Sequence, residues 1–118
     1  MSAYFLWYPR CSTCQKAKKW LDDNHIAYEA RDIKADHPSA EELKAWYDKS
    51  GLELKRFFNT SGQLYRSMNL KDKLPDMSLE QQLELLATDG MLVKRPLLIT
   101  EDTVLAGFRE TAYAQALR

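Results

Sequence analysis

The sequence lacks an excess of charge of either sign. Its 17 lysine and arginine residues are balanced by 17 aspartate and glutamate residues, so the formal net charge is +0. A broad surface for nucleic acid or for anionic membranes requires an excess of positive charge. We therefore expect neither direct nucleic-acid binding nor membrane binding.

Long apolar runs are also missing. The run from Ala3 to Tyr8 is far too short for a signal peptide or a membrane span, and no basic segment precedes it. We therefore expect a cytoplasmic protein. The 118 residues contain no repeat, low-complexity tract or linker, which predicts a single domain over residues 1–118.

Residues that bind metals are scarce, because the chain has two cysteines and two histidines. Ten residues separate Cys14 from His25, and eleven separate His25 from His37, spacings that fit no zinc finger. We therefore expect no metal site. His25 is expected at the C-terminal end of a helix and His37 in a loop.

The two cysteines form a Cys-x-x-Cys motif, Cys11-Ser12-Thr13-Cys14. The apolar run before it predicts a strand buried on both faces, and the apolar spacing after it predicts a helix over Ser12–Asn24. In a reducing compartment, such a pair is more often catalytic, regulatory or metal-binding than structural. The alternative is two unrelated core cysteines, which the spacing and the basic flanks disfavour.

The motif predicts different chemistry for its two sulfurs. Cys11 is expected at the start of the helix and Cys14 one turn along it, within reach of a disulfide. The unpaired N–H groups of the first turn, the helix dipole and the nearby Arg10 and Lys16 stabilise a thiolate. We therefore predict that Cys11 has a lowered pKa and attacks, while the more buried Cys14 resolves.

The remaining elements complete an α/β pattern. A second strand, parallel to the first, is expected at Ile26–Ile33, and Asn24 is expected to end the first helix in the left-handed conformation. We further predict helices at Ser39–Gly51, Leu64–Leu70 and Ser78–Gly90, a helical turn at Leu52–Phe58, a loop at Lys71–Met77, strands at Pro96–Thr100 and Thr103–Ala106, and a last helix from Arg109. Together they predict a thioredoxin/glutaredoxin-like fold, with a four-stranded mixed sheet and a helical insertion over residues 39–90.

Several segments resemble the ArsC/Spx family, in the same order along the chain. They are Tyr8–Ala17, Phe57–Thr60, Asp89–Leu92, Lys94–Leu97 and Gly107-Phe108. The resemblance covers essentially the whole chain and implies a thioredoxin fold with an ArsC-like helical insertion. The family includes glutaredoxin-coupled arsenate reductases, Spx transcription regulators and small redox proteins. The chain most resembles the Cys-x-x-Cys members among the last.

The resemblance also implies roles for residues outside the motif. A cis proline at Pro96 would face the cysteines and shape the docking groove, and Arg95 would lie near the sulfurs, holding a thiolate or an anionic substrate. On the sequence alone, a surface salt bridge explains Arg95 equally well. We expect catalytic roles for Cys11, Cys14 and Arg95, and substrate contacts from Arg10, Ser12, Thr13 and Pro96.

The function expected from these features is that of a thiol–disulfide oxidoreductase that uses a Cys11/Cys14 dithiol. It would need no bound cofactor, since electrons would come from glutathione, glutaredoxin or thioredoxin. Its partners would be such a thiol reductant or a protein disulfide substrate.

Two alternatives stay open. The first is an arsenate reductase, for which Cys11 and Arg95 match the family's cysteine and one arginine, whereas Asn59 and Phe108 stand where two further arginines are expected. The second is an Spx-like, redox-switched transcription regulator that binds the C-terminal domain of the RNA polymerase α subunit. The Cys-x-x-Cys motif fits the second alternative, but the insert matches it poorly.

Overall fold

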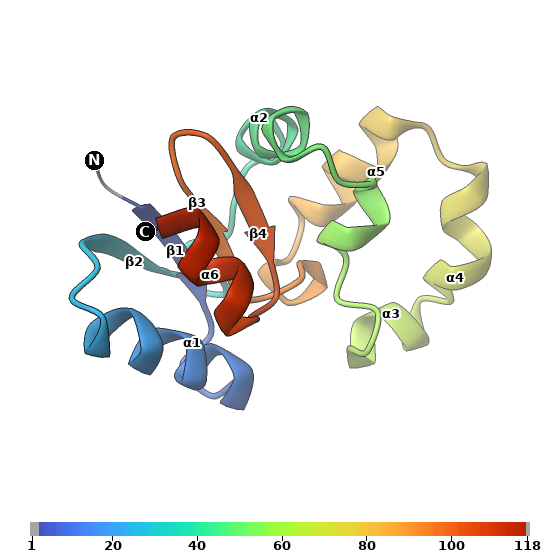
Figure 1. Cartoon of the computed structure of the whole chain (residues 1–118). Helices are drawn as coiled ribbons and strands as arrows, with labels where there is room; N and C mark the ends of the chain where they lie inside the picture. The colour runs from blue at the N-terminus through green and yellow to red at the C-terminus, as the bar shows by residue number, and fades with distance from the viewer. Residues whose placement is uncertain (1–2, 118) are drawn as a thin grey trace.

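The computed structural model describes residues 3–117 and is built around one four-stranded mixed sheet (Figure 1). Its strands are β1 (Ala3–Trp7), β2 (Tyr28–Asp32), β3 (Leu97–Ile99) and β4 (Val104–Ala106). The strand order is β2-β1-β3-β4; β1 and β2 are parallel, and β3 is antiparallel to both β1 and β4. The predicted sheet, including its parallel first pair, is confirmed.

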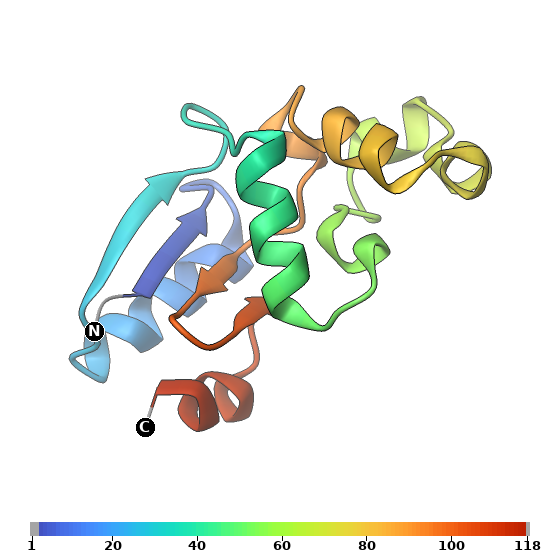
Figure 2. The ribbon, with the colours of Figure 1, turned by 90° about the horizontal axis from the view of Figure 1, so that it is seen from above.

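The helices fall into two groups. Those next to the sheet are α1 (Ser12–Asp23), α2 (Ala40–Ser50) and α6 (Glu110–Leu117). The insert continues from α2 through η1 (Leu54–Phe57), α3 (Gln63–Ser67), α4 (Leu70–Lys73), η2 (Leu74–Asp76), α5 (Leu79–Leu86) and η3 (Gly90–Leu92). Seen from above, α2 lies against the sheet, and the rest of the insert extends beyond it (Figure 2). None of the helices in the described part of the chain is long and apolar enough to cross a membrane.

The two faces of the sheet bury different partners. Phe5 packs with α1 and α6, in a cluster that includes Leu21 and Tyr113. Leu6, its neighbour in β1, packs on the opposite face with residues of the insert such as Trp46. Successive strand residues point to opposite faces, so a strand covered on both sides shows no polar alternation. This explains why β1 is apolar throughout.

Arg31 fixes the start of the insert. Its Nη1 and Nη2 atoms donate to the two carboxylate oxygens of Glu42 over 2.7 and 3.0 Å. Glu42 also closes a capping box with Ser39 at the start of α2. Glu42 therefore joins β2 to α2 through Arg31 and satisfies the backbone N–H of Ser39 at the helix terminus. The second predicted capping box, between Ser78 and Gln81 at α5, is also confirmed.

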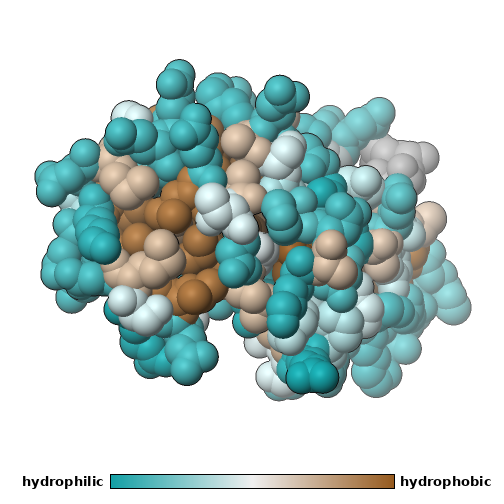
Figure 3. Space-filling view, turned by 180° about the vertical axis from the view of Figure 1, so that it is seen from behind, coloured by the Kyte–Doolittle hydropathy of each residue, from teal (hydrophilic) through white to brown (hydrophobic). Residues whose placement is uncertain are grey.

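The insert keeps part of its apolar surface near solvent. Several of its side chains are only half-buried against the core, namely Tyr47, Leu52, Leu64, Met68, Met77, Leu85 and Ala87. Seen from behind, apolar side chains gather on the side of the molecule that holds the insert (Figure 3).

The end of α1 differs from the prediction. Asn24 does not take the left-handed conformation, because its backbone and side-chain amides both donate to the carbonyl oxygen of Trp20 and extend the helical geometry. The left-handed residue is His25, with a φ of 56°. His25 therefore lies just beyond the helix, not within its last turn.

The predicted loop at Lys71–Met77 was also wrong. Its residues form α4 and η2, which bury Leu70 and Leu74. Pro75 is compatible with this geometry because it occupies the first turn of η2, where a backbone N–H has no helical partner.

The predicted helix end at Gly90 is wrong as well. α5 ends at Leu86 with Ala87 as its cap, and Gly90 begins η3. A β-carbon at Gly90 would overlap with the backbone carbonyl of Ile33. The glycine is therefore needed where the insert returns to the end of β2.

Candidate functional site

Cys11 occupies the N-cap of α1. Its backbone is extended, with φ −89° and ψ 121°, and its Sγ atom accepts a hydrogen bond from the backbone N–H of Cys14 over 3.4 Å. Serine, threonine or aspartate usually supplies the oxygen that accepts such a bond. Here a sulfur takes this place, so a backbone N–H without a helical partner and the positive end of the helix dipole both face the thiol.

The pKa of the Cys11 thiol lies below its ordinary value of 9.0. Partial burial alone would raise the pKa. Hydrogen bonds from the backbone and the thiol of Cys14, the positive charge of Arg95 and the backbone N–H of Thr13 lower it and outweigh the burial. The predicted activation of Cys11 therefore has a structural basis.

Cys14 has the opposite environment. It is fully buried in the first turns of α1, where burial raises the pKa of its thiol to about 12. A negative charge on Cys11 raises this pKa further. Both cysteines are free thiols in this structure. The site therefore holds one thiol that ionises easily beside one that stays protonated.

Arg95 and Pro96 lie at the start of β3. The peptide bond between them is cis, as the resemblance implies. The guanidinium of Arg95 lies 5.3 Å from the centre of the Tyr8 ring, and its Nη1 donates to the carbonyl oxygen of Met91 over 3.5 Å. Its charge lowers the pKa of both Cys11 and Cys14. Arg95 is therefore brought to the sulfurs, and no acidic partner holds it in the described part of the chain.

Arg95 also has an unsatisfied donor. Its Nε atom is buried and has no hydrogen-bond partner among residues 3–117. Such a donor is costly in an arginine with a purely structural role.

The other predicted substrate residues form the rim of the site. Arg10, Ser12 and Thr13 are exposed, and Pro96 is buried beside the cis bond. Their contacts with a substrate stay a prediction.

Two aromatic residues near the sulfurs cannot be assigned to the site from the sequence pattern. Tyr8 lies under the Arg95 guanidinium, although its sequence context indicates only a core aromatic. Tyr113 is fully buried, and its pKa is raised by burial and by the charge of Cys14. It packs edge-on against both Trp20 and Phe108. No local pattern could identify Tyr113, because about a hundred residues separate it from the motif.

Oxyanion binding has little support at the two positions where arginine is absent. Phe108 packs edge-on against Tyr113 with ring centres 4.9 Å apart, so it contributes to the core of the α6 face. The backbone of Asn59 donates to Leu92 over 2.8 Å. Neither residue can supply a positive charge.

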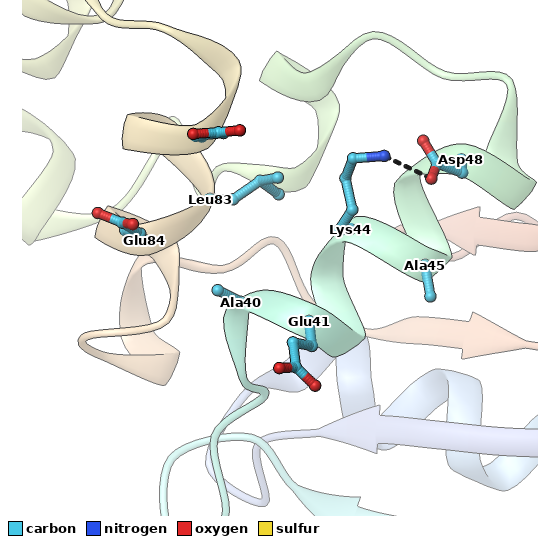
Figure 4. A pocket seen from close by; sticks show the side chains of 8 residues that line it. Ala40, Glu41, Lys44, Ala45, Asp48, Leu83 and Glu84 are labelled. Carbon is cyan, nitrogen blue, oxygen red and sulfur yellow. Dashed lines mark hydrogen bonds and ion pairs between the residues drawn. The ribbon is translucent and has the colours of Figure 1, made fainter.

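Within residues 3–117, no cluster of metal ligands is found, and the hollow between α2 and α5 lies apart from the redox site. Residues 3–117 contain no group of three or more histidine, cysteine, aspartate or glutamate side chains that could hold a metal ion. A hollow of about 460 Å³ lies between α2 and α5, lined by Leu83, Lys44, Asp48 and neighbouring residues (Figure 4). None of the residues assigned to the redox site lines it.

The sequence is similar to those of known proteins along nearly its whole length. Residues 6–116 match the model of the ArsC family.

The chain belongs to the ArsC family. It is 55% identical to the uncharacterized protein YusI of Bacillus subtilis, over 98% of both chains. A crystal structure of an ArsC family related protein from Bacteroides fragilis is 56% identical and superposes with a TM-score of 0.94, covering 98% of this chain and 97% of the other. The global transcriptional regulator Spx of Enterococcus faecalis is 29% identical, over 86% of this chain and 76% of its own. The fold expected from the sequence, a thioredoxin-like sheet with an ArsC-like insertion, is thus confirmed.

Proposed function

We propose that this ArsC-family protein is a cytoplasmic thiol–disulfide oxidoreductase in which Cys11 attacks and Cys14 resolves. One observation carries the proposal. The sulfur of Cys11 at the helix N-cap, which accepts a backbone hydrogen bond, lies within one helical turn of the buried sulfur of Cys14. A lowered pKa makes Cys11 the better thiolate at neutral pH, whereas burial protects Cys14 from external disulfides.

The reaction proceeds through a mixed disulfide. The Cys11 thiolate attacks one sulfur of the substrate disulfide, and the other substrate sulfur leaves as a thiolate and takes a proton. Cys14 then loses its proton and attacks the Sγ atom of Cys11. The second substrate sulfur leaves, and a Cys11–Cys14 disulfide forms. Two electrons have passed to the substrate, and an external thiol such as glutathione, glutaredoxin or thioredoxin returns them.

The electrostatics of the pair favour this order. In the reduced protein without substrate, the Cys11 thiolate raises the pKa of Cys14. Once Cys11 is in a mixed disulfide, its negative charge is gone and Cys14 ionises more easily. The resolving thiolate therefore becomes available at the step that needs it.

Arg95 has the role of holding the thiolate or an anionic substrate group. Its charge lowers the pKa of Cys11, and its unsatisfied buried Nε supports a functional role over a purely structural one.

A second candidate function follows from the likeness to Spx. An oxidised Cys11–Cys14 pair could regulate binding to the C-terminal domain of the RNA polymerase α subunit, without turning over a substrate. A pull-down with that domain, using oxidised and reduced protein, tests this candidate. Retention of the domain by the oxidised protein alone supports it, and no retention in either state removes it.

The decisive assay compares wild-type protein with Cys11→Ser and Cys14→Ser. Exchange of a protein or peptide disulfide should require both cysteines for complete turnover. Arsenate reduction that requires Cys11 but not Cys14 would instead support an arsenate reductase. The absence of turnover with either substrate would contradict the proposed enzyme.

A further inference from the structure

Positive charge gathers around two adjoining hollows beside β4. One, of about 230 Å³, lies along β4 and is flanked by Arg56 and Arg109. The other, of about 180 Å³, is lined by Lys55, Arg56 and Lys94 among others. Arg56 lines both hollows, so the two adjoin on one stretch of surface. We call it the cationic groove, defined by Lys55, Arg56, Lys94 and Arg109.

The charge of this groove is not neutralised locally. Glu53 is the acidic residue that lines it, against four cationic side chains. Within residues 3–117, none of the four cations forms an ion pair. Since the whole chain carries a net charge of +0, the groove is a local excess of positive charge in a neutral protein.

The first hollow also contains an unpaired strand edge. β4 is the last strand of the sheet, and Figure 1 shows it between α6 and the start of the insert. Hydrogen bonds join Thr100 to Thr103 and Pro96 to Gly107, which directs the backbone groups of Val104 and Ala106 away from β3. In the described chain no hydrogen bond reaches these groups from the outer side. Leu52, Ala106 and Ala112 give the hollow apolar walls.

The groove adjoins the redox site. Lys94 precedes Arg95 in the chain, and its Cε atom passes close to Gly107. The backbone N–H of Gly107 in turn donates to the carbonyl oxygen of Pro96 over 2.9 Å. Tyr113, whose pKa is raised by burial and by the charge of Cys14, lines the hollow along β4. One end of the groove therefore borders Arg95 and Pro96 of the redox site.

We propose that the cationic groove docks an extended, acidic segment of the protein whose disulfide is exchanged at Cys11. This inference rests on the proposed function and names its substrate class. A strand edge offers backbone donors and acceptors to an extended peptide, and the cations select acidic side chains along it. A small anion would use the cations but leave the strand edge and the apolar walls uncovered. Nucleic acid would not need the strand edge.

Binding without chemistry tests the docking directly. The probe is a short fluorescent peptide with alternating glutamate and valine and with serine in place of cysteine; its control carries glutamine in place of glutamate. By anisotropy at low salt, the acidic peptide should bind about tenfold more tightly, and the preference should largely disappear near 1 M salt, where the Debye length is about 3 Å. Equal affinity for the two peptides would overturn the proposal.

Charge reversal locates the site. Arg56→Glu, at the junction of the two hollows, should abolish the preference for the acidic peptide. Arg66→Glu, an exposed arginine outside the groove, should leave it unchanged. Arg109→Glu gives a second test if Arg56→Glu fails to fold, as judged by its thermal melt. An equal loss with Arg66→Glu would contradict the location, and tighter binding of a single-stranded oligonucleotide of the same charge would identify a nucleic-acid partner instead.

Failure of the docking and failure of the proposed function give different results. The binding assay uses Cys11→Ser protein, so it does not depend on exchange. Wild-type protein that reduces acidic and neutral peptide disulfides at equal rates would refute the groove but keep the oxidoreductase. Acidic peptide bound at Arg56 without any disulfide exchange would refute the proposed function.

Discussion

The Sγ atom of Cys11 accepts a hydrogen bond from the backbone N–H of Cys14, the residue that shares its Cys-x-x-Cys motif. The same three-residue spacing places the second sulfur on the buried side of α1. Within one helical turn, the two cysteines therefore have pKa values shifted in opposite directions. The helix N-terminus stabilises the thiolate of Cys11, whereas burial disfavours the thiolate of Cys14.

Removal of the Arg95 charge should make Cys11 less acidic. In Arg95→Met, the positive charge that lowers the pKa of Cys11 is absent, so this pKa should rise and the thiolate fraction near neutral pH should fall. The pH dependence of iodoacetamide alkylation of Cys11 measures the change. Arg66→Met is the control, since Arg66 is exposed on the insert. An unchanged profile in Arg95→Met would remove Arg95 from the redox site.

Cys14 should resist alkylation where an ordinary thiol reacts. Its pKa is raised to about 12, against an ordinary 9.0, and its side chain is buried. At pH 9 in the folded, reduced protein, peptide mapping by mass spectrometry should find Cys11 alkylated and Cys14 unmodified. In denaturant both should react alike. Equal reaction of the two cysteines in the folded protein would show that Cys14 is accessible.

The Arg31–Glu42 pair should make stability depend on pH in acid. Arg31 lowers the pKa of Glu42 from 4.5 to about 2, against the opposing effect of burial. Because the folded value is the lower one, this stabilisation is present above pH 4.5 and is lost as the pH falls toward 2. Glu42→Gln should therefore lower the free energy of unfolding at neutral pH by about 1 kcal/mol, since the carboxylate is partly screened by solvent.

The Glu42→Gln substitution isolates the charge, because glutamine also serves in a capping box, as Gln81 does at α5. The difference in unfolding free energy between wild type and variant should shrink as the pH approaches 2, as measured by urea unfolding. Glu41→Gln, at an exposed position in the same helical turn, should show no such trend. A constant difference at all pH values would show that the ion pair contributes nothing.

Gly90 should not tolerate a side chain. A β-carbon there would overlap with the backbone carbonyl of Ile33, which cannot move aside as a flexible side chain could. Gly90→Ala should therefore lower the free energy of unfolding by about 2 kcal/mol or more. Gly51→Asn is the matched control. A β-carbon added at Gly51 would have nothing within 4 Å, and asparagine tolerates the left-handed φ of 69°. Equal stability of Gly90→Ala and wild type would contradict the close approach.

Local patterns in the sequence predicted much of the fold. The unbroken apolar run of β1, the capping boxes at Ser39 and Ser78, and the strand–helix–strand spacing each follow from rules that act over a few residues. The predicted elements were wrong where tertiary contacts determine the local backbone structure. α4 and η2 form because Leu70 and Leu74 enter the core, and Gly90 is required by a strand that ends at distant Asp32.

The candidate site divides in the same way. The roles expected for Cys11 and Cys14 follow from their position at a helix start, which the sequence indicates. The approach of Arg95 to the sulfurs came only from the family resemblance, and on the sequence alone a surface salt bridge was equally possible. Tyr113 could not be found at all, because its contact with the α1 face depends on how α6 returns to the sheet.

The most direct test of the central claim is to trap the mixed disulfide. Reduced wild-type protein and Cys14→Ser are each treated with glutathione disulfide, quenched with acid and weighed by mass spectrometry. The proposal predicts one glutathione on Cys11 in Cys14→Ser. In the wild type it predicts a Cys11–Cys14 disulfide without an adduct. A stable glutathione adduct on wild-type Cys11, with Cys14 still reduced, would contradict the assignment of Cys14 as the resolving thiol.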